Sequence, residues 1–297
     1  MPFLRVVVTG GKGGTGKSFV ATNLAVLLSR SHPLLLADLD LEAPNDHILL
    51  GVEKLENEEP IEIFYPLIDY KKCTACGACA KVCDTGAIVM AKGRPPLVLP
   101  RLCSGCKACM FVCPYDAISP GLRIVGYTYS TWVKHGGGFR LVTGILREGE
   151  EHTPPAIYVA KRRAVREAEE MRARVMIIDT GAGTGNSISV SLQGADLVIA
   201  VTEPTPLGLH DLRSILEIVR GMGLRTWIVV NRYGIADDSR HRALAKEYGV
   251  EGYFTIPYSR EAAEAYARGT PVVEAFPESS VSKALHVLYD EVKGLTG

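Results

Sequence analysis

The sequence predicts an α/β protein with a mostly parallel, doubly wound sheet into which a small α+β domain is inserted. Two observations predict the sheet: short apolar runs of strand length alternate with helical segments, and the first of these runs leads into a glycine-rich loop. A third observation predicts the insertion: all eight cysteines of the 297 residues lie within residues 73–113. We expect a discontinuous main domain over residues 1–60 and 126–297, with the inserted domain over residues 61–125.

The first predicted strand, residues 4–9, is followed by a glycine-rich loop and by a predicted helix over residues 17–31. The loop fits the pattern G-x4-G-K-S, in which backbone N–H groups approach phosphates, the lysine reaches the terminal phosphates and the serine binds magnesium. A position between a strand and a helix is the context that such a phosphate-binding loop (P-loop) requires. The predicted nucleotide-binding residues here are Gly11, Gly13, Gly14, Thr15, Gly16, Lys17 and Ser18.

A second lysine, Lys12, lies inside this loop. The run from Lys12 to Ser18 resembles the deviant Walker A signature of the MinD and ParA ATPases. In that family the first lysine reaches the phosphates bound by a partner subunit. The resemblance therefore implies catalytic roles for Lys12 and Lys17, and a homodimer with two nucleotides, ATP or ADP, at its interface. The alternative for Lys12 alone is a solvated loop lysine.

The resemblance extends to two strands that end in acids. A strand over residues 34–37 leads into Asp38 and Asp40, similar to the family's switch I, and a strand over residues 175–179 ends in Asp179, the Walker B position. Carboxylates at the C-terminal ends of parallel strands lie where such sheets bind ligands. By resemblance, Asp40 orients the attacking water as a catalytic residue, Asp38 supports the shell of Mg²⁺, and Asp179 holds this ion directly or through water. Helix capping is the alternative for either switch I aspartate taken singly.

Three later residues are candidates for contact with the adenine base. Asn231 ends a predicted strand at the position where the family places a base-reading asparagine, and Pro257 and Tyr258 match the family's later base-side loop. The alternatives are a strand-end turn for Asn231 and core packing for Tyr258. Another strand is expected over residues 197–202, with helices over residues 209–222 and 281–292.

The cysteines form two successive copies of C-x2-C-x2-C-x3-C, the ligand pattern of iron-sulfur clusters. In two-cluster ferredoxins of the bacterial type, the last cysteine of each run binds the other run's cluster. The pattern predicts a ferredoxin-like domain with two 4Fe-4S clusters. One is expected on Cys73, Cys76, Cys79 and Cys113, and the other on Cys103, Cys106, Cys109 and Cys83.

Two other uses of the cysteines fit less well. A disulfide framework is typical of small secreted domains, whereas this chain can build a core without cross-links and shows no secretory signal. Structural zinc usually takes two C-x2-C units at longer separation, and here a third cysteine follows each pair at once. The iron-sulfur interpretation is therefore preferred.

Composition narrows the function classes. Hydrophobic residues make up 47% of the chain, the apolar runs are too short to span a membrane, and the formal net charge of zero argues against nonspecific binding to nucleic acid or membrane. The expected location is the cytoplasm. Residues 71–116 nevertheless carry seven bases and two acids, a local excess of 7 − 2 = +5. Two interpretations stay open: the bases offset the negative charge of clusters, or they form a basic face that docks an acidic partner.

Three functions remain from different classes. The first is an ATP-gated electron carrier for an unidentified redox partner, with a coupling that resembles the logic of nitrogenase's iron protein. The second is a carrier that delivers clusters or metal to a target metalloprotein, like the Mrp ATPases. The third is a redox-sensing regulatory or positioning ATPase. We favour the first, because the main domain has no cysteine for a bridging or transferable cluster.

Overall fold

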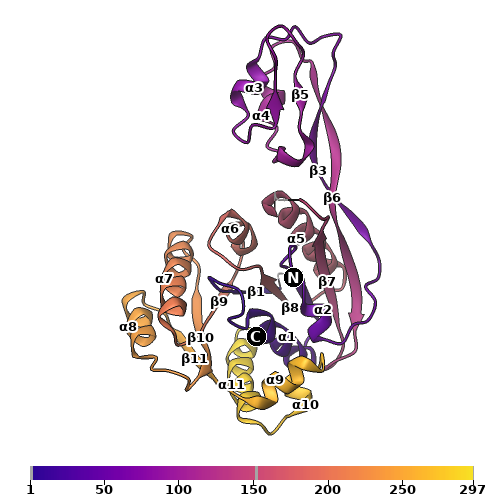
Figure 1. Cartoon of the computed structure of the whole chain (residues 1–297). Coiled ribbons are helices and arrows are strands. Elements are labelled where there is room, and N and C mark those ends of the chain that lie inside the picture. The colour runs from indigo at the N-terminus through magenta and orange to yellow at the C-terminus, as the bar shows by residue number, and fades with distance from the viewer. Residues whose placement is uncertain (1–2, 151–152, 297) are drawn as a thin grey trace.

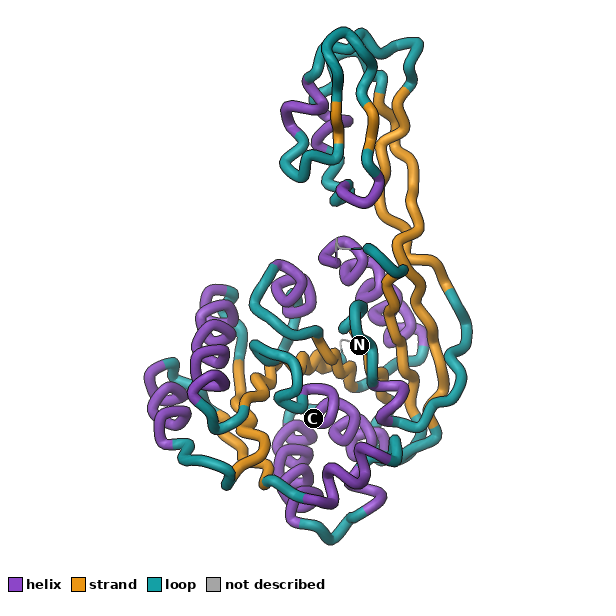
Figure 2. The backbone as a smooth tube through the Cα atoms, in the orientation of Figure 1, coloured by secondary structure: helices purple, strands orange, loops and turns teal. Residues whose placement is uncertain are grey.

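The computed structural model describes residues 3–150 and 153–296. Figure 1 shows a broad body and a small lobe, which are connected by two long strands, β3 (Glu59–Ile68) and β6 (Ile118–Val133). We call these two strands the arm and residues 69–117 the lobe. In Figure 2 the arm runs without a break from the body into the lobe.

The body is built on a nine-stranded sheet with the order β11-β10-β9-β1-β8-β2-β7-β6-β3. The first seven strands in this order are parallel, and β6 and β3 continue the sheet as antiparallel strands at one edge. The predicted fold class, a mostly parallel α/β sheet, is confirmed. The parallel strands are β1 (Leu4–Thr9), β2 (Leu34–Leu39), β7 (Phe139–Leu146), β8 (Val175–Thr180), β9 (Leu197–Thr202), β10 (Thr226–Tyr233) and β11 (Gly252–Pro257).

Helices cover both faces of this sheet, so its central strands are buried on both sides and appear in the sequence as continuous apolar runs. Successive residues of β1 face opposite ways: Val7 packs in one core, and Val6 and Val8 in the other. The first core lies under α5 (Thr153–Glu170), α6 (Asn186–Leu192), α7 (Pro206–Gly221) and α8 (Ser239–Glu247). The second lies under α1 (Lys17–Ser29), α9 (Arg260–Ala267), α10 (Val272–Ala275) and α11 (Ser280–Gly294).

The ends of the predicted helices differ from the structure by up to three residues. The helix expected over residues 209–222 begins at Pro206, because Thr205 caps it by accepting a hydrogen bond from the Gly208 backbone N–H, and proline suits the first helical position. Helix α1 ends at Ser29 instead of residue 31. The two-residue shift of α1 lies within the spread of one or two residues that is ordinary for helix ends.

The lobe has little regular structure. It contains the short helices α3 (Ala78–Val82) and α4 (Ala108–Phe111), a 3-10 turn at Pro100–Leu102, and a two-stranded sheet of β4 (Ile88–Val89) and β5 (Leu97–Val98). Among the described residues, its core cluster has five buried members, two of which are cysteines: Phe64, Cys79, Ile88, Cys109 and Ile118. So small an apolar core supplies limited stability by itself.

Helix α5 contacts the base of the arm, where β6 also pairs with β7 of the body. Arg163 of α5 is buried, and its guanidinium donates hydrogen bonds to the backbone oxygens of Thr128 at 2.6 Å and Asn57 at 2.6 Å. Arg166 donates to both carboxylate oxygens of Glu59. The boundaries predicted at 60/61 and 125/126 fall inside β3 and β6, so both strands belong partly to the body and partly to the lobe region. The division into two domains stays a prediction.

Candidate nucleotide and iron-sulfur sites

The P-loop connects β1 to α1 at the C-terminal edge of the sheet. Gly16 has a positive φ of 96°, and a Cβ there would lie 2.2 Å from the side-chain nitrogen of Asn231, so only glycine fits this position. The Lys17 ammonium is largely buried and donates to the backbone oxygen of Lys12 at 3.1 Å. Burial lowers the pKa of Lys17, while the charges of Asp179 and Asp40 act in the opposite direction.

Lys12 is held within its own subunit by an ion pair with Glu203. Glu203 also accepts from Arg232 at 3.1 Å. Burial acts to raise the pKa of Glu203, but the hydrogen bond from Lys12 and the charges of Lys12 and Arg232 outweigh it and lower this pKa. Lys12 is therefore neither a free loop lysine nor, in this state, extended away from the subunit.

The predicted magnesium residues converge at the ends of adjacent strands. Asp38 and Asp179 are register partners on β2 and β8, and both are buried. Ser18 donates to a carboxylate oxygen of Asp179 at 2.5 Å. Burial raises the pKa of Asp179 to about 7. Asp40 lies at the start of the loop that follows β2, and burial raises its pKa as well.

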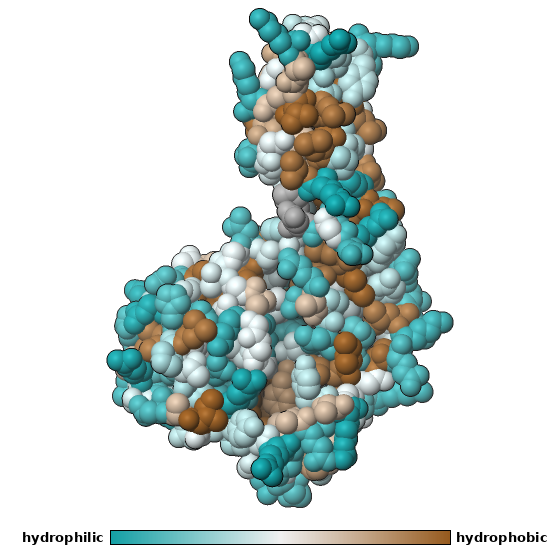
Figure 3. Space-filling model, in the orientation of Figure 1, coloured by the Kyte–Doolittle hydropathy of each residue, from teal (hydrophilic) through white to brown (hydrophobic). Residues whose placement is uncertain are grey.

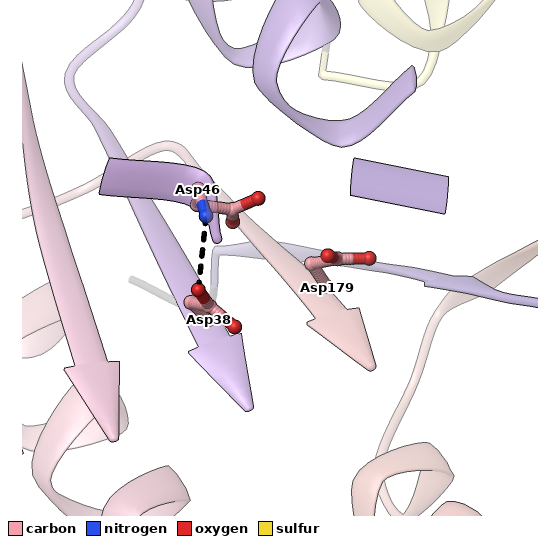
Figure 4. Close-up of side chains that lie close together, drawn as sticks. All are labelled: Asp38, Asp46 and Asp179. Atoms are coloured by element: carbon pink, nitrogen blue, oxygen red, sulfur yellow. Dashed lines mark hydrogen bonds between the residues drawn. The ribbon is translucent and has the colours of Figure 1, made fainter. Parts of the chain in front are cut away.

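Sequence reasoning missed one acid, Asp46. It is the first residue of the short helix α2 (Asp46–Leu49), and it is fully buried beside Asp38 and Asp179. Carboxylate oxygens of the three residues lie within 4.8 Å of one another. Figure 4 shows the three side chains converging from two strand ends and a helix start, with the Asp46 backbone N–H donating to Asp38 at 3.1 Å. The only sequence signal was a third aspartate a few residues after the two of switch I.

A cleft of about 800 Å³ opens beside these acids. Its lining includes most of the predicted nucleotide residues, namely Gly13, Gly14, Gly16, Lys17, Ser18, Asp40, Asn231, Pro257 and Tyr258. Two of the residues predicted to bind nucleotide, Gly11 and Thr15, are not in this lining. Thr15 is buried, and Gly11 packs so closely on Asp211 that a Cβ would lie 2.4 Å from that residue's Cβ. The cleft also has apolar walls that the sequence did not single out, among them Phe19, Ile235 and Tyr266.

Both ends of the Asn231 amide are engaged by backbone groups. Its nitrogen donates to the oxygen of Thr15 at 2.9 Å, and its oxygen accepts from the N–H of Arg232 at 2.9 Å. Asn231 thus anchors the P-loop in this state. Tyr258 lies exposed at the rim of the cleft instead of in the core. Contact of Asn231, Pro257 and Tyr258 with adenine stays a prediction.

All eight cysteines lie in the lobe, between Cys73 and Cys113. A small cavity of about 20 Å³ is lined by four of them, Cys73, Cys76, Cys79 and Cys113. Burial raises the pKa of Cys103, and the neighbouring thiols of Cys106 and Cys83 add to this shift. Burial and the thiols of Cys103, Cys106 and Cys79 raise the pKa of Cys109 to about 11. Two groups of soft thiolate donors fit iron-sulfur ligation.

The fold, the P-loop and the acids at the strand ends define a nucleotide-binding α/β protein. The family model of the CobQ/CobB/MinD/ParA nucleotide-binding domain matches residues 6–272. The chain therefore belongs to this family and is a P-loop ATPase of the MinD/ParA type.

Similarity to individual proteins supports this family assignment. The chain is 34% identical over 264 residues to an uncharacterized protein of Methanocaldococcus jannaschii, with 89% of each covered. It is 23% identical over 303 residues to a protein of Pyrococcus horikoshii named an iron-sulfur cluster carrier protein, with 97% of this chain and 85% of that protein covered. Among solved structures, it resembles the septum site-determining protein MinD complexed with Mg-ADP from Pyrococcus horikoshii, with a TM-score of 0.64, 20% identity and coverage of 100% and 98%.

Within the described part of the chain, none of the helices is both long enough and apolar enough to cross a membrane.

Proposed function

We propose that this ATPase carries two 4Fe-4S clusters in its lobe and uses its nucleotide state to control electron transfer to a partner protein. The observation that carries the proposal is the continuity of the arm. The strands that enter and leave the cysteine-rich lobe are strands of the same sheet whose C-terminal edge forms the nucleotide cleft. When bound, the clusters supply one-electron chemistry, and the chain supplies their position.

Sulfur spacing supports clusters over zinc. Tetrahedral zinc, with Zn–S bonds of about 2.3 Å, requires sulfurs about 3.8 Å apart. All eight cysteines are among the described residues, and no three of their Sγ atoms lie within 4.8 Å of one another. That spacing does not match a tetrahedral zinc site. The small apolar core of the lobe is a second argument for clusters. Bound clusters would cross-link segments of the lobe that otherwise pack weakly.

The metal content of the protein tests directly whether the cysteines bind two 4Fe-4S clusters. After anaerobic purification, we expect about eight iron atoms and eight acid-labile sulfides per chain, together with ATP hydrolysis. The measurement is elemental analysis with sulfide determination on the full chain. Stoichiometric zinc without labile sulfide would show that the cysteine assignment is incorrect.

Helix α5 gives a physical route between the two sites. On the arm side, Arg163 and Arg166 bind the base of β3 and β6. On the other side, the Lys161 ammonium donates to the backbone oxygens of Val190 at 3.1 Å and Ser191 at 2.7 Å, at the C-terminal end of α6. Helix α6 begins a few residues after the Walker B strand β8. A movement of the loop between β8 and α6 would therefore act on α5 and, through it, on the arm.

The lobe and the upper part of the arm offer a surface suited to a protein partner. Phe111 is 77% exposed and Leu122 is 67% exposed. Figure 3 shows hydrophobic side chains gathered over the lobe and along the upper arm. Together with the local excess of positive charge, this favours an acidic partner that docks near the clusters.

The proposed homodimer requires Lys12 to leave Glu203 and reach the partner subunit's nucleotide. Glu203→Gln removes the competing carboxylate, so we expect the ATP-bound dimer to form about tenfold more tightly, equal to ~1.4 kcal/mol. Sedimentation with a nonhydrolysable ATP analogue measures this. Glu247→Gln, which breaks the exposed ion pair with Arg213, is the matched control and should leave dimerisation unchanged. A weaker Glu203→Gln dimer would mean that the ion pair orients Lys12 and does not restrain it.

The similarity to iron-sulfur cluster carrier proteins favours cluster delivery as the second candidate function. Against it, all eight cysteines lie in the two runs of the lobe, and complete four-cysteine ligation favours retention of a cluster over its donation.

A further inference from the structure

We propose that Asp38, Asp46 and Asp179 form a divalent-cation site that binds its metal before nucleotide arrives, with Asp46 as an additional ligand. The inference deepens the proposed nucleotide site, because two of these residues are also expected to serve Mg²⁺ there.

The three carboxylates come from three different elements: the C-terminal ends of β2 and β8 and the first turn of α2. None is more than 1% exposed. Their oxygens lie within 4.8 Å of one another, a spacing that one cation can bridge. In Figure 4 the side chains of Asp46 and Asp179 extend in the same direction, toward the right of the view.

Free acceptor atoms distinguish Asp46 from its neighbours. Asp38 accepts from the backbone N–H groups of Asp40, Asn45 and Asp46, and one oxygen of Asp179 accepts from Ser18. Within residues 3–150 and 153–296, both carboxylate oxygens of Asp46 and the second oxygen of Asp179 are buried without a hydrogen-bond partner. A buried carboxyl group whose oxygens have no hydrogen-bond partner either stays protonated or ionises and binds a cation.

Of the described residues, no positively charged side chain is among the groups that act on Asp46. The charged groups that act most strongly on Asp46 are Asp38, Asp179 and Asp40, all carboxylates. Lys17 of the loop interacts with the charges of Asp179 and Asp40, and its ammonium donates to the loop backbone. A divalent cation would offset two of three clustered negative charges.

The donor set selects the class of metal. Carboxylate oxygens are hard ligands, which suit Mg²⁺ and Mn²⁺. Magnesium sites of nucleotide enzymes commonly use one or two carboxylates and depend on substrate phosphates for further ligands. Three buried carboxylates provide enough protein oxygens to retain the ion when phosphates are absent.

Titration of the full-length, chelator-treated, nucleotide-free protein with Mn²⁺ tests the site. The electron paramagnetic resonance signal of free Mn²⁺ is expected to report one tight site per chain. Asp46→Asn should weaken this binding at least tenfold, and Asp290→Asn, an exposed carboxamide substitution on α11, should not change it. Wild-type protein that binds no Mn²⁺ without nucleotide, or Asp46→Asn protein that binds it equally well, would overturn the proposal.

Thermal unfolding provides a second readout that does not depend on activity. Added Mn²⁺ is expected to raise the midpoint of the wild-type protein more than that of Asp46→Asn or Asp46→Ala. Equal increases in all three proteins would contradict the site. ATP hydrolysis is measured separately. A protein that binds Mn²⁺ alone but does not hydrolyse ATP would support this inference and contradict the proposed function. A protein that hydrolyses ATP but binds no Mn²⁺ without nucleotide would contradict this inference and leave the proposed function standing.

Discussion

Replacement of Lys17 by alanine is expected to slow ATP hydrolysis at least a hundredfold while the iron and sulfide content of the lobe stays unchanged. Lys17 is the first residue of α1, is largely buried and lines the cleft, and the charges of Asp179 and Asp40 act on its ammonium. A positive charge held in a desolvated site stabilises developing phosphate charge far more than it would in water, and loss of one such group typically costs ~10²–10³ in rate. Phosphate release measures hydrolysis, and visible absorbance follows the clusters.

Lys246→Ala is the matched control, because Lys246 is exposed on α8 and far along the chain from the P-loop. It should hydrolyse ATP at the wild-type rate. A Lys17→Ala protein that keeps more than a tenth of the activity would contradict the P-loop assignment. Loss of cluster absorbance in the same variant would mean that the lobe depends on the folded nucleotide site.

The second large effect concerns which cysteines share a cluster. Cys73→Ser and Cys113→Ser are each expected to remove about four of eight iron atoms, because both line the same cavity. The double variant Cys73→Ser, Cys113→Ser should then also lose about four. By contrast, Cys73→Ser combined with Cys83→Ser should lose nearly all the iron, because one ligand is removed from each cluster.

Iron and sulfide analysis of these four variants distinguishes the possible pairings. If the Cys73, Cys83 pair retained four iron atoms and the Cys73, Cys113 pair lost all eight, each run would hold its own cluster and the crossover would be wrong. Serine keeps the size of the side chain and removes the soft thiolate, so the loss reports ligation more than packing.

Much of the fold could be predicted because its signals are local. The strands β8 and β9 are buried throughout, and β1 is buried from Val6 onward, so each is marked by a run of apolar residues. Their bounds match the predictions to within a residue. The P-loop is a contiguous motif whose glycines and lysine are specified by backbone geometry and phosphate chemistry.

The remainder depends on contacts between distant segments. The arm was assigned to the inserted domain because the cysteines mark only the lobe, and nothing in residues 59–68 shows that this strand extends the main sheet. Glu203 lies 191 positions from Lys12 and belongs to no motif, so their ion pair could not be anticipated. Asp46 could not be singled out for a related reason. Its distinguishing feature is its position beside Asp38 and Asp179 in space, which the sequence around it does not show.

Redox titration of the anaerobically purified protein with ATP analogue or with ADP tests the central claim most directly. If the nucleotide state acts on the lobe through α5 and the arm, at least one cluster potential should differ between the two states, by about 60 mV for a tenfold change in the reduction equilibrium. Identical potentials and identical reduction rates in both states would contradict the coupling of nucleotide state to electron transfer.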